Sequence, residues 1–241
     1  MISVCMATYN GAKYITEQIS SIIPCISEKD EIIISDDGST DGTLNILEKF
    51  ASDYSNIRIV KGPSCGLIAN FSNALSQAKG DIIFLSDQDD IWYPDKVSKV
   101  LQAFSQGDYA LVVHNARLVD ADGKPIGSTL FELRHSKTGF FKNLVKNSYV
   151  GCCMAVKRDL LTVALPIPVD IEMHDWWLGL LSEVTSKSIF VDEVLIDYRR
   201  HGSNCSSMDH YPLKIIVKNR LLLIKEIVKR VTNKKRKEKI S

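Results

Sequence analysis

The first hundred residues alternate regularly between short apolar runs and segments with helical spacing. Apolar runs typical of strands occupy residues 2–7, 31–35, 57–60 and 81–85. Segments whose apolar residues recur at helical spacing follow each of them, at 14–22, 41–50, 67–78 and 95–104. Strands and helices of this length build repeated βα units with parallel strands. The alternation therefore predicts an α/β fold with a doubly wound, mostly parallel sheet.

The rhythm changes after residue 109. We expect strands at 110–114, 149–156 and 188–195, a hairpin turning at Asp122 and Gly123, and helices at 140–145 and 176–181. The last predicted element is an amphipathic helix at 215–231, followed by a basic tail. A chain of 241 residues can bury one large core, so one domain with a C-terminal appendage is the simplest arrangement.

Charge is segregated along the chain. Eleven basic and two acidic residues follow position 213, a net charge of +9, which leaves −8 for the first 213 residues of a chain whose net charge is +1. A basic amphipathic helix can lie on anionic lipid, so we expect peripheral membrane contact through this segment. A solvated helix with a disordered end and nucleic-acid binding are the alternatives, and we expect no nucleic-acid partner.

The sequence predicts a cytoplasmic protein. No apolar run approaches the roughly 20 residues of a membrane-spanning helix, and no basic region precedes the first apolar residues. The six cysteines form no CxxC pair and no metal-ligand spacing, which favours reduced thiols. An attachment to the inner face of the cytoplasmic membrane would come from the basic segment alone.

Three polar stretches follow predicted parallel strands: "TYNGA" at 8–12, "DDGSTDG" at 36–42 and "SDQDD" at 86–90. Ligands of doubly wound sheets bind beyond the carboxyl ends of the strands, where these stretches should meet. An Asn-Gly turn explains the first stretch equally well, and helix capping explains Ser39 and Asp41. Capping does not explain Asp36 and Asp37, which could accept hydrogen bonds from a base or a ribose.

The third stretch places three acids directly after a buried strand. Asp87 and Asp89 are two residues apart, which suits a hard divalent cation, Mg²⁺ or Mn²⁺, shared with a substrate diphosphate. An acidic loop that caps the helix beginning near Asp95 is the alternative. The chain has no GxGxxG after the first strand, no GxxxxGK[ST] and no GxSxG, so dinucleotide-binding, P-loop and serine-hydrolase chemistry lack their motifs.

These stretches resemble those of the inverting family 2 glycosyltransferases, which have the GT-A fold. The resemblance covers about residues 2–204. Its motifs are "ATYNG" at 7–11, "SDDGSTDGT" at 35–43, "FLSDQDDIWYPDKV" at 84–97, "HDWW" at 174–177 and "YRRHGSN" at 198–204. "SDQDDIW" followed by "HDWW" is most similar to the rhamnosyltransferase-like branch, which builds bacterial surface polysaccharides.

The resemblance implies roles for residues on the donor side. Asp87 and Asp89 would form the DxD motif, with Asp89 in most direct contact with the metal and His201 as a further ligand of metal or diphosphate. A surface-loop histidine is the alternative for His201. The residues implied to bind the nucleotide sugar are Thr8, Tyr9, Asn10, Asp36, Asp37, Asp87, Gln88 and Arg199. Many members carry a basic residue where this chain has Ala69, so the metal, His201 or Arg199 and Arg200 must supply the phosphate contacts.

On the acceptor side, Asp175 stands where the family places its catalytic base, and an N-cap role is the alternative. Trp176, Trp177 and Gly151 are expected to contact the acceptor, although core packing is the better explanation for at least one tryptophan. The implied arrangement is a transferase domain at 1–212, with a nucleotide-sugar-binding half at 1–109 and an acceptor-binding half at 110–212, followed by the basic segment 213–241.

The implied function is metal-dependent, inverting transfer of a sugar to a lipid-linked or polysaccharide acceptor. Rhamnose from dTDP-rhamnose is the candidate donor sugar. Two alternatives remain open: a non-catalytic nucleotide-sugar-binding scaffold subunit, and a nucleotidyltransferase, for which the chain lacks a Gly- and Arg-rich triphosphate loop.

Overall fold

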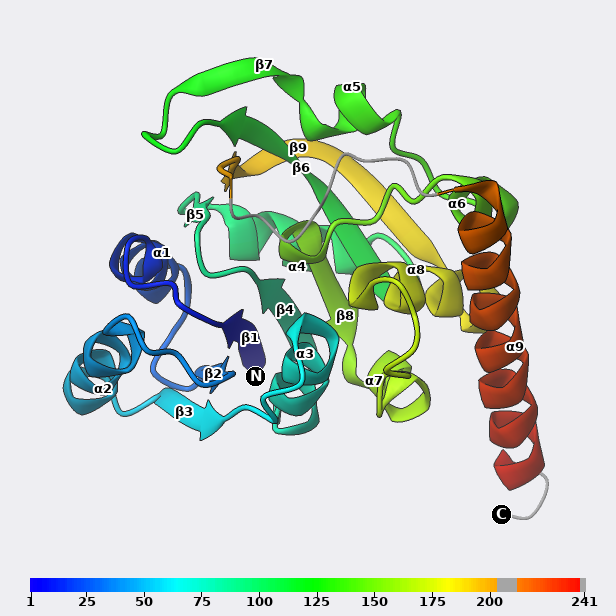
Figure 1. The fold of residues 1–241 in the computed structure, drawn as a ribbon, viewed down its shortest axis with the longest axis horizontal. Coiled ribbons are helices and arrows are strands. Elements are labelled where there is room, and N and C mark those ends of the chain that lie inside the picture. Colours follow the sequence, from blue (N-terminus) through cyan, green and yellow to red (C-terminus); the bar gives the residue numbers. More distant parts are fainter. Residues whose placement is uncertain (203–211, 239–241) are drawn as a thin grey trace.

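The structure, a computed structural model, describes residues 1–202 and 212–238. The strands of this part form one mixed sheet in the order β3-β2-β1-β4-β8-β6-β9-β5, with β7 paired to β6 (Figure 1). Their bounds are β1 Ile2–Thr8, β2 Glu31–Asp36, β3 Ile57–Lys61, β4 Ile82–Ser86, β5 Ile91–Trp92, β6 Leu111–Val119, β7 Pro125–Thr129, β8 Met154–Lys157 and β9 Ser188–Arg199.

The first four strands of this order are parallel, as the βα alternation predicts. Helices α1 (Ile15–Ile22), α2 (Thr43–Asp53) and α3 (Leu67–Ser76) connect them, and α4 (Lys96–Ser105) follows β5. Every residue of β1 is buried, and so are Ile32, Ile33 and Ile34 in β2. Side chains on both faces of these strands are therefore covered by packed helices, which explains their unbroken apolar runs.

The sheet is continuous between the two predicted halves. β4 pairs antiparallel with β8, β8 pairs antiparallel with β6, and β6 runs parallel to β9. The short strand β5 also pairs with β9, through Ile91 and Trp92. Residues from before and after position 109 therefore contribute neighbouring strands to the same sheet, and no linker separates them.

Helices of the second half cover the far end of the sheet. They are α5 Leu130–Arg134, α6 Phe140–Val145, α7 Arg158–Ala164, α8 His174–Thr185 and α9 Leu213–Glu238. Residues 174–182 of α8 are all buried, so this helix lies inside the second half. α9 lies along the edge of the molecule opposite α1 and α2 (Figure 1).

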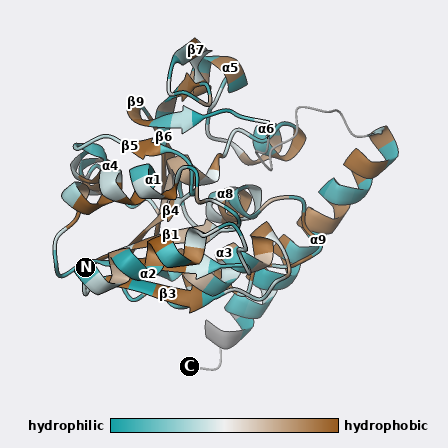
Figure 2. Ribbon diagram, turned by 60° about the vertical axis from the view of Figure 1, so that its left-hand side comes forward, coloured by the Kyte–Doolittle hydropathy of each residue, from teal (hydrophilic) through white to brown (hydrophobic). Residues whose placement is uncertain are grey.

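α9 is docked on the body through one of its faces. Its residues Leu223 and Ile227 are buried, and its Arg220 guanidinium lies 3.9 Å from the ring centre of Trp176 in α8. Arg230 donates to the carbonyls of Val163 and Leu165 at the end of α7, where a cation stabilises the helix terminus. Hydrophobic and hydrophilic segments alternate along α9 (Figure 2). Within residues 1–202 and 212–238, no helix has the length and apolarity needed to span a bilayer.

Most predicted elements are present with ends shifted by a few residues, and three differences are informative. The predicted strand 149–156 is wrong in its first half, because residues 151–153 form a 3-10 turn (Gly151–Cys153) and β8 begins at Met154. The short helices α5 and α7 escaped the sequence analysis. α9 continues through 232–238, which the sequence assigned to a tail, and the last residues of that tail, 239–241, lie outside the described residues.

Candidate active site

The first two polar stretches meet beyond the carboxyl ends of β1 and β2. The backbone N–H of Asn10 donates to Ser39 Oγ at 2.8 Å, and the N–H of Thr40 returns a 2.9 Å bond to Asn10 Oδ1. Gly11 N–H also donates to Thr43 Oγ1 at 2.8 Å. Adjacent parallel strands end at one edge of a sheet, so loops far apart in sequence come into contact there.

Thr8 and Asp36 are joined below these loops. Thr8 Oγ1 donates to Asp36 Oδ2 at 3.0 Å, and both side chains are buried. The same carboxylate accepts from the N–H groups of Gly38 and Ser39 and from the Ser39 hydroxyl. Asp36 thus organises the loop that follows β2, and a contact with the nucleotide stays a prediction.

Asp37 holds a third loop against the site. Its carboxylate accepts from the N–H of Ser64 at 2.7 Å and from the N–H of Gly66 at 2.8 Å. Ser64 and Gly66 both have positive φ, at 55° and 86°, so this loop is tightly turned. The predicted bond from a base to Asp37 would have to share the carboxylate with these two donors.

Gln88 ties the acidic loop to the end of β1. Its side-chain amide accepts from Tyr9 N–H at 2.9 Å and donates to the Tyr9 carbonyl at 3.1 Å. A Cβ on Gly11 would lie 2.4 Å from Gln88 Oε1. The absence of a side chain at Gly11 therefore makes room for the Gln88 amide, in addition to any approach of a ligand. The ring of Tyr9 is 58% exposed and remains available to line a base.

The three acids after β4 lie close enough to act on one another electrostatically. Burial, together with the nearby charges of Asp89 and Asp175, raises the pKa of Asp87 to about 7. Burial and the charges of Asp89 and Asp87 raise the pKa of Asp90 well above its usual range. Asp90 Oδ2 is buried and has no hydrogen-bond partner among the described residues.

This cluster fits a divalent cation. Ligand atoms of Asp87, Asp90 and Cys152 lie within 4.8 Å of one another, and one buried oxygen of Asp90 has no hydrogen-bond partner in the part of the chain that the structure describes. Carboxylate oxygens are the donors that Mg²⁺ and Mn²⁺ prefer, and a cation would relieve both the repulsion and the unmet hydrogen-bonding capacity. Asp90, which the sequence analysis left unassigned, therefore joins the predicted pair Asp87 and Asp89 as a candidate ligand.

His201 and Arg199 approach the same loop from the end of β9. His201 Nε2 lies 2.7 Å from Asp89 Oδ2, which brings together two of the predicted metal ligands. Arg199 is buried, and its guanidinium donates to the Asp89 carbonyl at 2.8 Å and to Glu17 Oε2 at 2.6 Å. Arg199 thus fixes the acidic loop, and its contact with phosphate stays a prediction. Ser203 and Asn204 of the fifth motif lie outside the described residues.

Asp175 lies in the first turn of α8 and is 5% exposed. Its carboxylate accepts from the N–H of Trp176 at 2.6 Å, from the N–H of Gly151 at 3.2 Å and from Asn147 Nδ2 at 3.4 Å. Burial raises its pKa to about 6, and these hydrogen bonds and the positive charge of Arg134 act against that rise. The charge of Asp175 also raises the pKa of Asp87, so the two carboxyl groups lie close enough to interact electrostatically.

The other residues predicted to contact the sugar acceptor are buried in the protein. Trp176 and Trp177 are both buried, and their indole N–H groups donate to the carbonyls of Asn143 at 2.6 Å and Ala164 at 3.1 Å. Core packing therefore describes both rings in this structure. A Cβ on Gly151 would lie 2.7 Å from His174 Nε2, so Gly151 allows the close packing that orients Asp175.

Three residues near the acids escaped the sequence analysis. Lys96 is fully buried, donates from Nζ to the Cys152 carbonyl at 2.9 Å and lies 3.8 Å from the ring centre of Trp92. Burial lowers its pKa to about 8, and the charge of Asp90 opposes this shift. Only its place in the motif "WYPDKV" distinguished Lys96. Asn147 and Arg134 had no sequence signal, because their proximity to Asp175 arises from tertiary packing.

Solved structures of other transferases share this fold. S. aureus TarS (residues 1–349, in complex with UDP-GlcNAc) matches 93% of this chain and 66% of its own, with a TM-score of 0.72 and 19% identity. The mannosyltransferase PcManGT of Pyrobaculum calidifontis, in complex with GDP-Man and Mn²⁺, matches 82% of this chain and 56% of its own, with a TM-score of 0.63 and 20% identity. The fold is therefore the GT-A fold of these transferases, and this chain spans about two thirds or less of their lengths.

The sequence comparisons give the family. The model of the family described as Glycosyl transferase family 2 matches residues 3–163. The dTDP-rhamnosyl transferase RfbG of Shigella flexneri is 32% identical over 239 residues, which cover 89% of this chain and 80% of RfbG. This chain belongs to glycosyl transferase family 2 and is a glycosyltransferase, which favours the transferase prediction over both alternatives.

Proposed function

We propose that this protein transfers a sugar, with inversion, from a nucleotide-diphosphate donor to a hydroxyl group of a lipid-linked or polysaccharide acceptor in bacterial surface glycan synthesis. The observation that carries the proposal is the position of Asp175. This buried carboxylate lies in the second half of the chain, yet its charge acts on Asp87 at the end of β4. Donor and acceptor chemistry would thus meet between the two halves.

Asp175 is suited to act as the general base. Inverting transfer requires a base that takes the proton of the acceptor hydroxyl as its oxygen attacks the anomeric carbon. A pKa of about 6 leaves Asp175 mostly ionised at neutral pH, while making it a stronger base than an exposed aspartate. The N–H groups of Gly151 and Trp176 hold the carboxylate in one orientation.

The donor would lie on the edge formed by β1, β2 and β4. Tyr9 would line the base, with Thr8, Asn10, Asp36, Asp37 and Gln88 shaping the pocket and Arg199 bracing it. Asp87, Asp89, Asp90 and His201 would hold Mn²⁺ or Mg²⁺. That ion, when bound, supplies positive charge to the departing nucleotide diphosphate.

The donor sugar is proposed to be rhamnose, carried on dTDP. The supporting observation is the 32% identity to a dTDP-rhamnosyl transferase over most of both chains. The structural neighbours hold UDP-GlcNAc and GDP-Man, which belong to more distant proteins of 19–20% identity. The acceptor is proposed to be lipid-linked, with the basic C-terminal segment in contact with the membrane.

A transfer assay with a panel of nucleotide sugars, with and without Mn²⁺, tests this proposal. We expect release of dTDP from dTDP-rhamnose and a product whose anomeric configuration, measured by NMR, is opposite to that of the donor. Asp175→Asn should lower kcat by about 100-fold or more while calorimetry shows unchanged donor binding. Asp170→Asn, an exposed acid close by in sequence, is the matched control. Retention of configuration, or full turnover by Asp175→Asn, would exclude the proposed mechanism.

A further inference from the structure

The two faces of α9 differ in what they contact. The inward face packs on α7 and α8 through Leu223, Ile227 and Arg230. Arg220, on the same side, forms a 3.0 Å ion pair with Glu172 and covers Trp176. These contacts fix the rotation of α9 about its own axis, so its other face is directed away from the protein.

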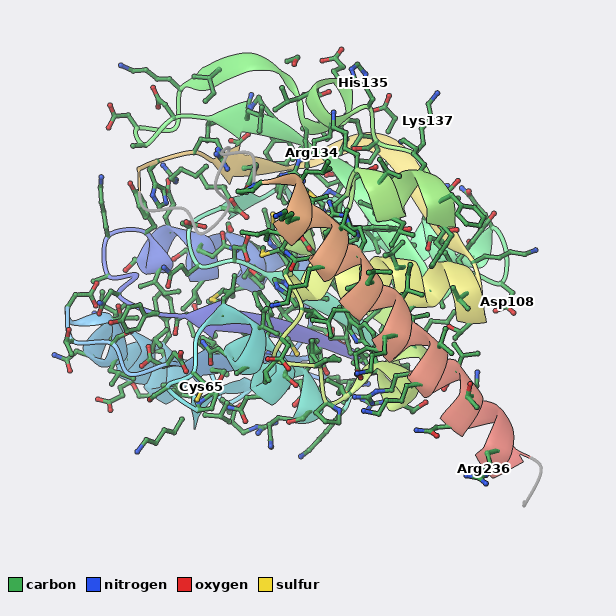
Figure 3. The ribbon with its side chains drawn as sticks, turned by 45° about the vertical axis from the view of Figure 1, so that its right-hand side comes forward. Cys65, Asp108, Arg134, His135, Lys137 and Arg236 are labelled. Atoms are coloured by element: carbon green, nitrogen blue, oxygen red, sulfur yellow. The ribbon has the colours of Figure 1, made fainter. Side chains whose placement is uncertain are left out.

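The outward face carries apolar residues beside lysines. Val217, Leu221 and Val228 are 49%, 62% and 57% exposed, and their spacing of four and seven residues aligns them in one stripe. Lys214, Lys218 and Lys225 follow the same periodicity next to this stripe and are exposed. The acid Glu226 lies off the stripe, with a side chain that is 16% exposed. Figure 3 shows α9 crossing the outside of the molecule, with Arg236 near its C-terminal end.

Helix α6 adds a second apolar surface next to α9. Phe141 and Val145 are one turn apart and are 80% and 76% exposed. The Val145 carbonyl accepts from Arg220 Nη2 at 3.3 Å, which places the end of α6 beside the first half of α9. Lys146, also exposed, follows directly. Exposed apolar residues that gather on neighbouring helices mark an interaction surface.

This surface lies one layer of side chains from the proposed catalytic base. Trp176, which Arg220 covers, directly follows Asp175 and donates to the carbonyl of Asn143 in α6. The segment after α6 contains Asn147, whose side chain donates to Asp175. A partner bound to α6 and α9 would therefore border the acceptor side of the site.

We propose that the outward face of α9 and the exposed face of α6 together dock on an anionic lipid surface and bring a lipid-linked acceptor to Asp175. Lysines beside an apolar stripe match negatively charged headgroups and the acyl region beneath them. A second copy of the chain is the less favourable occupant, since two identical faces would place lysines against lysines. The inference deepens the membrane contact of the proposed function by assigning it to these two faces, and the delivery of acceptor to Asp175 rests on the base role proposed for that residue.

Vesicle flotation of the full chain tests the docking. We expect binding to vesicles of phosphatidylcholine mixed with phosphatidylglycerol, weaker binding at high salt, and little binding to phosphatidylcholine alone. The triple variant Lys214→Gln, Lys218→Gln, Lys225→Gln should bind about 100-fold more weakly, and Phe141→Ser with Leu221→Ser should also weaken binding. Lys49→Gln with Leu133→Ser, exposed residues outside this surface, is the control pair.

Each alternative gives a distinct result. Absence of flotation by folded protein, or flotation unchanged in the α6 and α9 variants, would overturn the docking proposal. Sedimentation that reveals a dimer lost in Leu221→Ser would identify a second copy as the occupant instead. Transfer to a short acceptor without lipid should be equal in wild type and in both variants, whereas failure of all three to transfer would count against the proposed function and leave the vesicle result standing.

Discussion

Asp175 makes the catalytic rate and the folding stability depend on pH in opposite directions. Its pKa of about 6 exceeds the value of 3.8 expected for an exposed aspartate, because burial disfavours the charged form. A raised carboxyl pKa contributes stability that is complete below the unfolded pKa and is lost as the pH rises through about 6. Catalysis requires the ionised form, which that same rise in pH produces.

We therefore expect kcat to fall about tenfold per pH unit below about pH 6, without unfolding. A pH–rate profile with saturating substrates, combined with thermal melts across the same range, measures both effects. Through Asp175, the melting temperature should rise slightly from neutral pH to about pH 5 while the activity falls. A rate that stays constant to about pH 4 would show that Asp175 is not the base.

Asp90 is expected to destabilise the metal-free protein. Its carboxyl group is buried beside Asp87 and Asp89, and one of its oxygens has no hydrogen-bond partner among the described residues. Asp90→Asn removes the cost of keeping a titratable acid there and retains an acceptor for the Arg199 N–H. We expect this variant to be about 1 kcal/mol more stable than wild type without metal. Thermal melts should show stabilisation by Mn²⁺ in the wild type and little in Asp90→Asn. Equal Mn²⁺ stabilisation of both would remove Asp90 from the ligand set.

Sequence reasoning selected residues whose chemistry shows in their spacing, and their catalytic and metal-binding roles stay predictions. The DxD pair and Asp175 stand out as acids at the ends of predicted elements, and the structure brings Asp87 and Asp175 into electrostatic contact. Lys96 could not be recognised, because a lysine at the start of a predicted helix is normally solvated. Only the tertiary fold shows that it is buried against Trp92 and the Cys152 carbonyl.

At the scale of elements, α9 is expected to stabilise the body through one face only. Leu223→Ala and Ile227→Ala remove buried side chains and should each lower the free energy of unfolding by about 2–4 kcal/mol. Leu221→Ala and Val228→Ala, on the exposed face, should change it by less than about 0.5 kcal/mol. Urea denaturation of the four variants measures the contrast. Similar losses from both faces would mean that α9 is oriented differently on the body.

The elements that could be predicted are those with long and regular apolar patterns. β1, β2 and β4 are covered on both faces, so their apolar runs are unbroken and their positions were predicted within two residues. The run 149–156 is also largely apolar, but its residues 151–153 form a turn in which the Gly151 N–H donates to Asp175, a tertiary contact that the sequence pattern does not show. Short helices such as α5, with five residues, have too few turns to show a period.

Because both halves of the chain contribute strands to one sheet, we expect the whole molecule to unfold cooperatively. Strands β4 and β5 of segment 1–109 pair with strands β8 and β9 of segment 110–202. We expect one calorimetric transition with a ratio of calorimetric to van't Hoff enthalpy of about 1. A fragment of residues 1–109 should fail to fold alone, because β4 would lose its partner β8. Two resolved transitions would show that the halves are separate folding units.

Sequence alone predicted the α/β class and the group of acids that follows β4. It could not predict how the C-terminal segment is placed on the body. Its charge of +9 and its apolar periodicity predicted a basic amphipathic helix followed by a tail. In the structure Arg220 and Arg230 are directed inward and bind Glu172 and backbone carbonyls, so they are unavailable to an external partner. Which basic residues are free depends on the rotation of α9, and packing against α7 and α8 sets that rotation.

The loop that Asp37 holds offers a means of observing the donor site directly. Cys65 lies between the two residues whose N–H groups bind Asp37, and it is the exposed cysteine among the described residues, the others being wholly or partly buried (Figure 3). A fluorophore attached to its sulfur would sit at the rim of the proposed nucleotide pocket. Once Cys205, which lies outside the described residues, has been replaced, such a label would follow donor arrival and departure in real time, separately from the chemical step.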